Sequence, residues 1–321
     1  MVNEGEFGFL QFDLERFCII RPNFVIFMDS PVNVTVGLCV KNCEATVEKA
    51  VKSIINQDYP QQAMELAVVD GYSKDNTIPI IKTCLANTNL KNNFYSDNHG
   101  LGKARQTVVE NAAGNYIVWV DGDMVLSRDF IRNQVEFMEA NPQVGIGKGK
   151  YGVNRKDKLV ATLENMEFLI NFELEGETAF KSLGTSGCIY RLQAIREAGG
   201  FDPNFKGVGE DMDAEYRVRE QGWKLYVTHA VFYEKRRETW RSLWDEYFWH
   251  GYGWQSLLTK NRDMINITKL LPPVAVVIEL TRIPKAYKLT YQKAAFLLPL
   301  HYVFKRIAWF LGFMKSHRHY N

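Results

Sequence analysis

A buried strand that ends in two carboxylates is the feature of this sequence that most limits how the chain can fold. Residues 116–120 are consecutive apolar residues, and Asp121, Gly122 and Asp123 follow them directly. A short apolar run of this kind predicts a strand covered on both faces, as the central strands of α/β sheets are. Such a strand carries both carboxylates to its carboxyl end, where open α/β sheets bind their ligands.

Two interpretations of Asp121 and Asp123 follow from their chemistry. Carboxylate oxygens are the hard ligands that Mg²⁺ or Mn²⁺ prefers, and such an ion keeps further positions for substrate phosphates. The same tripeptide is also ordinary turn chemistry, because Asp and Gly both favour turns. The rest of the sequence has to distinguish a metal-held diphosphate from a plain turn.

Short apolar strands alternate with amphipathic helices upstream of this strand. Residues 34–40 and 65–69 predict strands, and residues 44–56 between them predict a helix. Apolar residues recur at helical spacing along one face of that helix: Val47, Ala50, Val51, Ile54 and Ile55. A β-α-β order of this kind requires parallel strands joined by right-handed crossovers, so the fold class is α/β.

The composition is that of a folded protein in a reducing compartment. Hydrophobic residues make up 46% of the 321 residues and charged residues 24%, which excludes a disordered chain and allows one large domain with an appendage. The five cysteines include no Cys-x-x-Cys pair and are expected to act as small apolar residues: Cys18, Cys39, Cys43, Cys84 and Cys188.

The chain divides into three parts by composition. Charged residues in residues 1–31 interrupt any apolar core, so a signal peptide is not expected there. The apolar residues of the same segment must be covered, and we expect an N-terminal arm with an extra strand packed on the main domain. Residues 32–240 form the expected catalytic domain, and residues 241–321 form an aromatic and basic helical region.

Polar residues follow the predicted strands, and basic residues lie near the start of one predicted helix. Asp70, after the second strand, could accept a hydrogen bond from a nucleobase or could cap the next helix. Lys103 and Arg105 lie near the start of a helix that is expected to end with Gly114 at its C′ position. Basic groups at a helix N-terminus oppose the macrodipole unless an anion is present, which favours phosphate contact.

Taken in order, these residues resemble the nucleotide-sugar half of family-2 inverting glycosyltransferases with the GT-A fold. Seven motifs carry the resemblance: Asn42 with Glu44, residues 69–77, His99-Gly100-Leu101 with Arg105, Asp121-Gly122-Asp123, Gly184-Thr185-Ser186-Gly187 with Arg191, Gly199-Gly200-Phe201-Asp202, and Gly209-Glu210-Asp211-Met212-Asp213. Each motif is weak by itself, but their common order and spacing over residues 32–260 are specific. The resemblance implies a mixed sheet with helices on both faces.

The resemblance also implies roles for individual residues. It implies donor binding at eight positions: Val40, Asn42, Asp70, Lys103, Arg105, Asp121, Gly122 and Asp123. Asp70 would hold the base of a nucleotide-diphospho-sugar, whereas Asp121 and Asp123 would hold the ribose and, through Mg²⁺ or Mn²⁺, the diphosphate. Asp211 would be the catalytic base, with Glu210 beside it. An alternative is that Glu210, Asp211 and Asp213 only complement a helix dipole.

Inverting transfer of a sugar requires residues with these roles. A single in-line displacement at the anomeric carbon needs one base for the acceptor hydroxyl and one electrophile for the departing diphosphate. A divalent ion supplies the second function without a proton donor. If the acceptor is a phosphate, which is already anionic, Asp211 acts more as a positioning group than as a base.

Several positions depart from the family pattern. Tyr72 stands where glycine is common, Cys43 where an acid is common, and Lys41 where an aromatic residue is common. Family members often have a histidine as a further metal ligand where this chain has Glu234, and His229 lies five residues earlier. Either residue could be a ligand, although a surface glutamate is the commoner case. The sequence has no Gln-x-x-Arg-Trp motif of processive synthases, which favours transfer of a single sugar.

The C-terminal region allows two interpretations. Seven aromatic residues crowd residues 240–254, which suits either a bilayer interface or a helix packed on the catalytic domain. Residues 159–172 predict a helix over the acceptor side. Residues 294–314 are long enough to span a bilayer, but Lys305 and Arg306 near the middle make a span unfavourable.

Charge favours a location on a membrane surface. Residues 282–321 hold eight Lys or Arg and no Asp or Glu. A basic, aromatic tail of this kind is expected to lie on an anionic leaflet, peripheral to the cytoplasmic face of the cell membrane. The alternative is a helical hairpin packed on protein or on a partner subunit. Nucleic-acid binding is not expected, because the tail is too apolar.

Three functions fit the sequence. The first is transfer of a single sugar from a nucleotide-diphospho-sugar to a polyprenyl phosphate or a lipid-linked saccharide. The second is the same reaction on a soluble or protein acceptor, with the tail as a docking element. The third is a nucleotide-sugar-binding scaffold without turnover, which the intact set of Asp121, Asp123 and Asp211 disfavours.

Overall fold

The computed structural model describes residues 18–21, 24–27, 32–153, 157–178, 182–205, 207–260 and 272–320. Two short strands near the N-terminus, β1 (Cys18–Arg21) and β2 (Phe24–Phe27), pair antiparallel in a sheet of their own. The strand structure expected in the N-terminal arm is therefore present as a separate hairpin. The remainder of residues 1–31 lies outside the described part of the chain.

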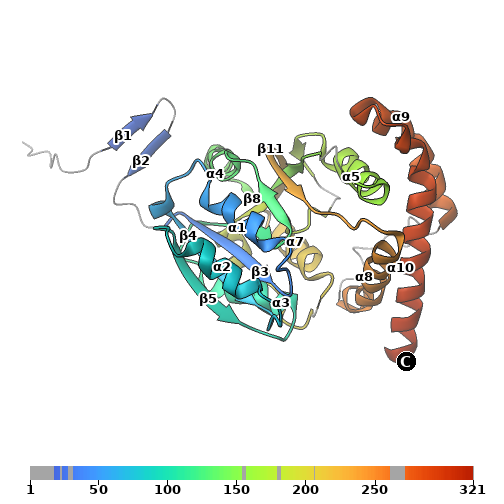
Figure 1. The fold of residues 1–321 in the computed structure, drawn as a ribbon, viewed down its shortest axis with the longest axis horizontal. Helices are drawn as coiled ribbons and strands as arrows, with labels where there is room; N and C mark the ends of the chain where they lie inside the picture. Colours follow the sequence, from blue (N-terminus) through green and yellow to red (C-terminus); the bar gives the residue numbers. More distant parts are fainter. Residues whose placement is uncertain are drawn as a thin grey trace, which may run out of the picture.

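A mixed sheet of nine strands forms the centre of the molecule (Figure 1). Its order is β5-β4-β3-β6-β10-β8-β11-β7, and β9 pairs with β11. The strands are β3 (Val34–Val40), β4 (Met64–Asp70), β5 (Lys91–Ser96), β6 (Tyr116–Asp121), β7 (Met124–Leu126), β8 (Val144–Tyr151), β9 (Gly176–Glu177), β10 (Cys188–Arg191) and β11 (Lys224–Glu234). The first four strands in this order are parallel, as the β-α-β pattern predicted.

The helices follow the strands in chain order. They are α1 (Val47–Ile55), α2 (Thr77–Leu85), α3 (Leu101–Asn111), α4 (Phe130–Ala140), α5 (Leu159–Phe172), α6 (Leu192–Glu197), α7 (Glu210–Glu220), α8 (Trp240–Lys260), α9 (Pro272–Thr290) and α10 (Leu298–Tyr320), with short 3-10 helices at Gln61–Ala63 and Lys293–Leu297. The strand order reverses after β5, so right-handed crossovers place α3 on the opposite face of the sheet from α1 and α2.

The register of the parallel strands brings their carboxyl ends together. Val40 pairs with Asp70, Asp70 pairs with Ser96, and Cys39 pairs with Asp121. Polar residues that are far apart in the sequence therefore share one edge of the sheet. The strand order reverses at β3, which lies between β4 and β6, and the carboxyl edge at such a reversal is the usual ligand site of open α/β sheets.

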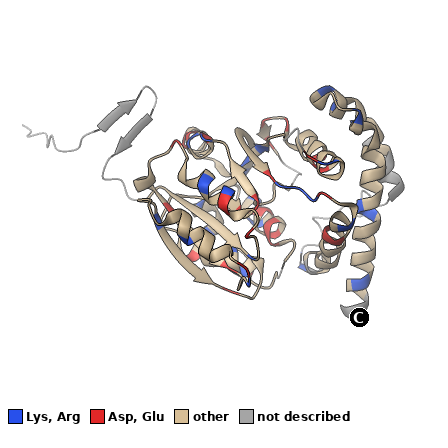
Figure 2. Cartoon of the chain, viewed as in Figure 1, with Lys and Arg blue, Asp and Glu red and all other residues tan. Residues whose placement is uncertain are grey.

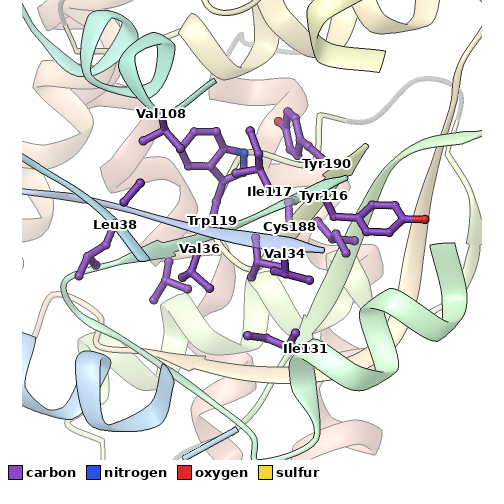
Figure 3. Close-up of a cluster of buried hydrophobic side chains, with 14 of the residues drawn as sticks. Val34, Val36, Leu38, Val108, Tyr116, Ile117, Trp119, Ile131, Cys188 and Tyr190 are labelled. Carbon is purple, nitrogen blue, oxygen red and sulfur yellow. The ribbon is translucent and has the colours of Figure 1, made fainter. Parts of the chain in front are cut away.

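A buried tryptophan explains the glycine in the middle of β3. The Trp119 side chain lies among the buried residues shown in Figure 3, edge-on to Tyr190 and Phe201 with ring centroids 6.1 and 5.4 Å away. A Cβ atom at position 37 would lie 2.7 Å from the Trp119 ring. Gly37 is therefore required for this packing rather than for a turn.

The expected role of Gly114 is wrong. Helix α3 ends at Asn111, its C-cap Ala112 is extended, and Gly114 does not have a positive φ. A Cβ atom at position 114 would lie 2.7 Å from the backbone nitrogen of Thr35. Close backbone approach to β3, and not a left-handed helix cap, is the reason for this glycine.

The C-terminal helices pack on one another and on α5 (Figure 1). Helices α8 and α10 cross with their backbones in contact, since a Cβ atom on Gly251 would lie 1.8 Å from the Trp309 carbonyl oxygen. The aromatic residues of α8 contribute to this contact: Trp244 lies 5.2 Å from Phe304, and Trp254 lies 5.1 Å from Trp309, between ring centroids. Of the two interpretations of residues 240–254, a helix packed on protein describes most of these side chains.

A buried ionic cluster anchors α10 to α5. Lys305 is only 1% exposed, and its Nζ lies 2.5 Å from Glu164 Oε1, donates to Glu167, and lies 3.1 Å from the Tyr247 hydroxyl. Glu164, Glu167 and His301 are close enough together to ligate a cation, but the Lys305 ammonium already supplies the positive charge. Burial, with the Lys305 charge, lowers the pKa of His301 to about 3, so this histidine is neutral.

This cluster corrects the expected charge of the tail. Lys305 faces protein carboxylates, and Lys285 forms an ion pair of 2.8 Å with Glu173. The segment Lys293–His317 has the length and mean hydropathy of a helix that could cross a membrane, but 33% of it is buried in the protein. Not all eight cations of residues 282–321 are therefore available to an anionic surface.

Candidate active site

The two carboxylates after β6 are held in place by their neighbours. Asp121 Oδ2 accepts a hydrogen bond of 2.6 Å from the Ser186 hydroxyl. Gly122 allows the turn to pass close to the segment between β3 and α1, because a Cβ atom there would lie 2.6 Å from the Cys43 sulfur. Asp123 follows in the turn between β6 and β7. The motif is thus a packed turn whose carboxylates lie at the ligand edge of the sheet.

Glu234 is the third carboxylate at this position. Strand β11 pairs with β7 so that Glu234 lies opposite Met124, and the Lys235 N–H donates to the Asp123 carbonyl at 3.0 Å. The Glu234 side chain is 17% exposed, and Oε2 is buried with no hydrogen-bond partner among the described residues. The expectation of a surface glutamate is wrong. His229 is exposed further back on β11.

Asp121, Asp123 and Glu234 offer oxygen ligands of the kind that a divalent cation prefers, although among the described residues the set whose ligand atoms lie within 4.8 Å of one another is Glu164, Glu167 and His301. Burial, with the charges of Glu234 and Asp121, raises the pKa of Asp123 to about 7. Like charges that are brought together inside a protein are relieved either by a proton or by a metal ion. The unpartnered oxygen of Glu234 and the raised pKa of Asp123 are both consistent with Mg²⁺ or Mn²⁺ at this edge of the sheet.

Metal binding at this site is expected to strengthen with pH. Below pH 7 the ion must displace the Asp123 proton, so Mn²⁺ affinity should rise about tenfold per pH unit up to pH 7 and then level off. Calorimetric titrations of Mn²⁺ between pH 5.5 and 8 measure this. Asp123→Asn should bind Mn²⁺ weakly at every pH. If the Mn²⁺ affinity of the wild type were equally independent of pH, the assignment of Asp123 as a metal ligand would be contradicted.

The predicted base-binding residues lie at the ends of β3 and β4. Asp70 Oδ1 accepts a hydrogen bond of 3.0 Å from the Ser73 N–H, which lies in the loop before α2, and Asn76 rather than Asp70 is the N-cap of that helix. Asn42, at φ 50°, accepts from the Lys74 N–H at 2.8 Å. These bonds join the two loops that follow Val40 and Asp70. Base recognition by Asp70 and Asn42 remains a prediction.

Tyr72 shows why a glycine is common at its position. Its φ is 59°, in the left-handed region that favours glycine, and its side chain is 58% exposed. A bulky residue in this conformation costs energy, so the surrounding loop has to hold it in place. The departure from the family pattern therefore changes the side chain next to Asp70 but not the path of the backbone.

Arg105 connects the carboxylates after β6 to α7. Its buried guanidinium donates to Glu210, and its Nη2 lies 4.0 Å from Asp121 Oδ1. Burial raises the pKa of Glu210, and the Arg105 charge opposes that rise. Lys103 instead pairs with Glu110 at 3.6 Å along α3. Of the two predicted basic residues, the structure brings only Arg105 to the carboxylates.

The acidic first turn of α7 contains three different environments. Glu210 pairs with Arg105, and Asp213 is buried against Arg217 and Lys260 at 2.7 and 3.0 Å. Asp211 lines a cavity, and no cation of the described residues lies within ion-pair distance of it. The alternative role, complementing the helix dipole, does not explain why Glu210 and Asp213 have ion-pair partners whereas Asp211 has none among the described residues. Asp211 is the one acid of the three that is open to a substrate.

The cavity beside Asp211 has a volume of about 460 Å³. Helix α5 contributes Phe168 and Phe172, as expected for a helix over the acceptor side. Other lining side chains were not predicted from the sequence to belong to a site: Lys148, Tyr247, His250, Trp254, Arg306 and Trp309. No local pattern distinguishes them, because they reach the cavity from β8, α8 and α10.

A buried glutamate shapes one wall of the cavity. Glu215 accepts hydrogen bonds of 2.9 and 3.1 Å from the Leu183 N–H, which holds the loop that contains Ser186. Burial, with the charge of Asp211, raises the pKa of Glu215 to about 7. The same loop contains Ser186, whose hydroxyl donates to Asp121. One loop therefore supports both the carboxylate at the end of β6 and the wall of the cavity.

Comparison with known proteins finds similar sequences and structures. Residues 35–197, more than half of the chain, match the sequence profile of glycosyl transferase family 2. Poly-β-1,6-N-acetyl-D-glucosamine synthase of Staphylococcus epidermidis is 22% identical over 209 residues, covering 63% of this chain and 48% of that protein. The synthase of Staphylococcus aureus is 20% identical over 253 residues, covering 77% and 60%. The chain spans about half the length of the first relative.

Two solved structures share the fold. The mannosyltransferase PcManGT from Pyrobaculum calidifontis, in complex with GDP-Man and Mn²⁺, has a TM-score of 0.64 at 18% identity, covering 92% of this chain and 89% of that one. S. aureus TarS 1–349 with UDP has a TM-score of 0.51 at 16% identity, covering 90% and 92%. The predicted GT-A fold, a mixed sheet with helices on both faces and a C-terminal helical extension, is confirmed.

Proposed function

This chain belongs to glycosyl transferase family 2, and from that premise we propose that it transfers a single sugar to a polyprenyl phosphate or a lipid-linked saccharide. The donor is a nucleotide sugar. The observation that carries the proposal is that Asp121 and Glu234 end strands at one edge of the sheet with Asp123 in the turn between β6 and β7, and that Arg105 connects Asp121 to a cavity that Asp211 lines. Such an arrangement provides a donor side and an acceptor side in contact.

On the donor side, the protein binds and orients the nucleotide diphosphate. Asp121, Asp123 and Glu234 would hold Mg²⁺ or Mn²⁺, which when bound supplies positive charge for the departing diphosphate. Asp70 and Asn42 lie where the base of the nucleotide would enter, at the ends of β3 and β4. The Ser186 hydroxyl and the Arg105 guanidinium fix the direction of Asp121.

On the acceptor side, Asp211 removes the proton of the attacking hydroxyl. The acceptor oxygen forms a bond to the anomeric carbon as the bond from that carbon to the diphosphate oxygen breaks. The electron pair of the broken bond leaves with the nucleoside diphosphate, and the configuration inverts. The proton goes to the Asp211 carboxylate, whose position at the cavity wall gives it access to the acceptor.

The outer face of α10 supports a location on the cytoplasmic membrane surface. Large apolar side chains are exposed along it: Leu300, Ile307, Phe310, Leu311 and Met314. Helices α9 and α10 carry basic residues, of which Lys305 and Arg306 face the protein and Lys315 is exposed, and α10 carries no acidic residue (Figure 2). A row of exposed apolar residues with neighbouring cations suits an anionic bilayer surface. Sedimentation with anionic vesicles should be lost when Ile307, Leu311 and Met314 are replaced by Ser, and unchanged sedimentation would remove this argument.

Donor binding tests the proposed function directly. UDP-, GDP- and dTDP-sugars are titrated with Mn²⁺ or Mg²⁺ by calorimetry, together with a measurement of slow donor hydrolysis. UDP-N-acetylglucosamine and GDP-mannose are included because of the names of the relatives and the ligand of PcManGT. We expect one donor to bind only with metal, and Asp123→Ala to abolish that binding. Folded protein that binds no donor would favour a non-catalytic scaffold.

A further inference from the structure

The lining of the cavity beside Asp211 holds four cations, Arg105, Lys148, Arg236 and Arg306, and four carboxylates, Glu210, Asp211, Glu234 and Glu246, but not all of them are paired with one another. Lys148 is fully buried and donates a hydrogen bond to the carbonyl oxygen of Ser186, while Arg306 donates to the Tyr302 hydroxyl. Within the described ranges, no carboxylate lies within ion-pair distance of Lys148 or Arg306. Two cations at the lining therefore have no ion-pair partner, compared with one carboxylate, Asp211.

The other charges of the lining are matched. Glu210 pairs with Arg105, and Glu246 pairs with Arg237 at 2.8 Å. Arg236 gives one nitrogen, Nη1, to Glu234 at 2.8 Å. Lys148 and Arg306 therefore line the cavity without an ion-pair partner among the described residues, and Arg236 lines it with only Nη1 in an ion pair.

Arg236 has a free hydrogen-bond donor inside the protein. Its side chain is only 8% exposed, lies over the Phe168 ring at 3.8 Å, and donates from Nε to Asn165 at 3.3 Å. The remaining nitrogen, Nη2, is buried with no hydrogen-bond partner among the described residues. A buried donor without a partner is costly, and an anion in the cavity would remove that cost.

Arg306 is a second donor of the same kind on α10. Its Nε is buried with no partner in the described part of the chain, and its guanidinium lies 4.7 Å from the Tyr302 ring centroid. The preceding residue, Lys305, is the anchor of the buried ionic cluster. The cluster therefore fixes Arg306 at the cavity wall, so a helix at the end of the chain completes a site formed by the catalytic domain.

We propose that Arg236 and Arg306 bind the phosphate of the acceptor, with Lys148 adding positive charge from beneath. The inference rests on the proposed function, because it names the acceptor group that occupies this cavity. Asp211 lines the same cavity without an ion-pair partner, and a carboxylate there would repel a phosphate nucleophile. The arrangement therefore favours an acceptor in which a sugar hydroxyl attacks and a phosphate is only held, as in a lipid-linked saccharide.

Binding of a short prenyl phosphate tests the site apart from the donor. Farnesyl phosphate, farnesol and inorganic phosphate are titrated calorimetrically into the full chain with EDTA, so that no metal recruits phosphate to the donor side. The wild type should bind farnesyl phosphate at least about tenfold more tightly than it binds the other two ligands. Arg306→Gln should lower the affinity for farnesyl phosphate by at least about tenfold. Lys315→Gln is the matched control, because Lys315 is an exposed cation of α10 outside the cavity; its affinity should stay within about twofold.

Arg236→Lys provides a second variant that keeps the charge. This substitution should also weaken the binding of farnesyl phosphate, since lysine cannot reproduce the planar fork of donors that arginine has. Equal affinity for farnesyl phosphate and farnesol would overturn the proposal, as would wild-type affinity in both Arg306→Gln and Arg236→Lys. Inorganic phosphate that binds as tightly as farnesyl phosphate would indicate a free-anion site and not an acceptor site. Metal-dependent donor binding is measured separately, and its absence would count against the proposed function alone.

Discussion

Replacing Asp211 with Asn is expected to lower the rate of sugar transfer by at least about a hundredfold while leaving metal-dependent donor affinity within about twofold of wild type. Asp211 lines the cavity and has no ion-pair partner in the described residues, so its carboxylate is available to an acceptor hydroxyl. The amide has nearly the same shape but cannot accept the proton. The loss should therefore appear in the turnover number and not in donor binding.

The matched control is Asp58→Asn. Asp58 is an exposed carboxylate whose partner is Arg132 at 3.5 Å, and its removal should leave transfer within about twofold of wild type. Transfer by Asp211→Asn at the wild-type rate would show that the base is misassigned. A small loss would indicate a phosphate as nucleophile, because that acceptor has no proton to remove.

Replacing Lys305 with Met is expected to lower the free energy of unfolding by about 3–5 kcal/mol. The ammonium is the positive partner of Glu164 and Glu167 between α10 and α5, and Met leaves both carboxylates inside the protein without it. An uncompensated buried charge is among the most costly changes that a point substitution makes. Thermal and denaturant unfolding of the full chain measure the effect.

The ion pair between Lys285 and Glu173 is the control for this substitution. It connects α9 to the residue that follows α5, and both side chains are partly exposed, so Lys285→Met should cost about 0–1 kcal/mol. Adding Glu164→Gln and Glu167→Gln to Lys305→Met should recover much of the stability, because no buried charge then remains. Equal unfolding curves for Lys305→Met and Lys285→Met would contradict the buried cluster.

The central sheet was predictable from local patterns. The apolar run at residues 116–120 and the helical spacing of Val47, Ala50 and Ile54 are set by burial, and burial acts on neighbouring residues in sequence. Strands β3 and β4 and helix α5 lie where the sequence predicted them. Polar residues after parallel strands must meet at one edge, so Asp70 and Asp121 were brought together by topology that the sequence already implied.

The C-terminal region was predicted less well for a physical reason. A run of cations such as that in residues 282–321 indicates an anionic partner but not where that partner lies. Lys305 has its partners on α5, with Glu164 separated from it by 141 positions in the chain. The sequence therefore showed the charge, whereas only tertiary contact showed that this charge is neutralised inside the protein.

The candidate site divides in the same way. By itself the sequence determined the strand ends, because strand period is a local property, and its resemblance to a known family predicted that Asp121, Asp123 and Asp211 belong to one site. Only the tertiary structure decided that Glu234 is buried beside Asp123 and that Arg306 reaches the cavity of Asp211. The electrostatic environment of a side chain depends on all charges within a few ångströms of it, and those charges come from segments that the sequence keeps far apart.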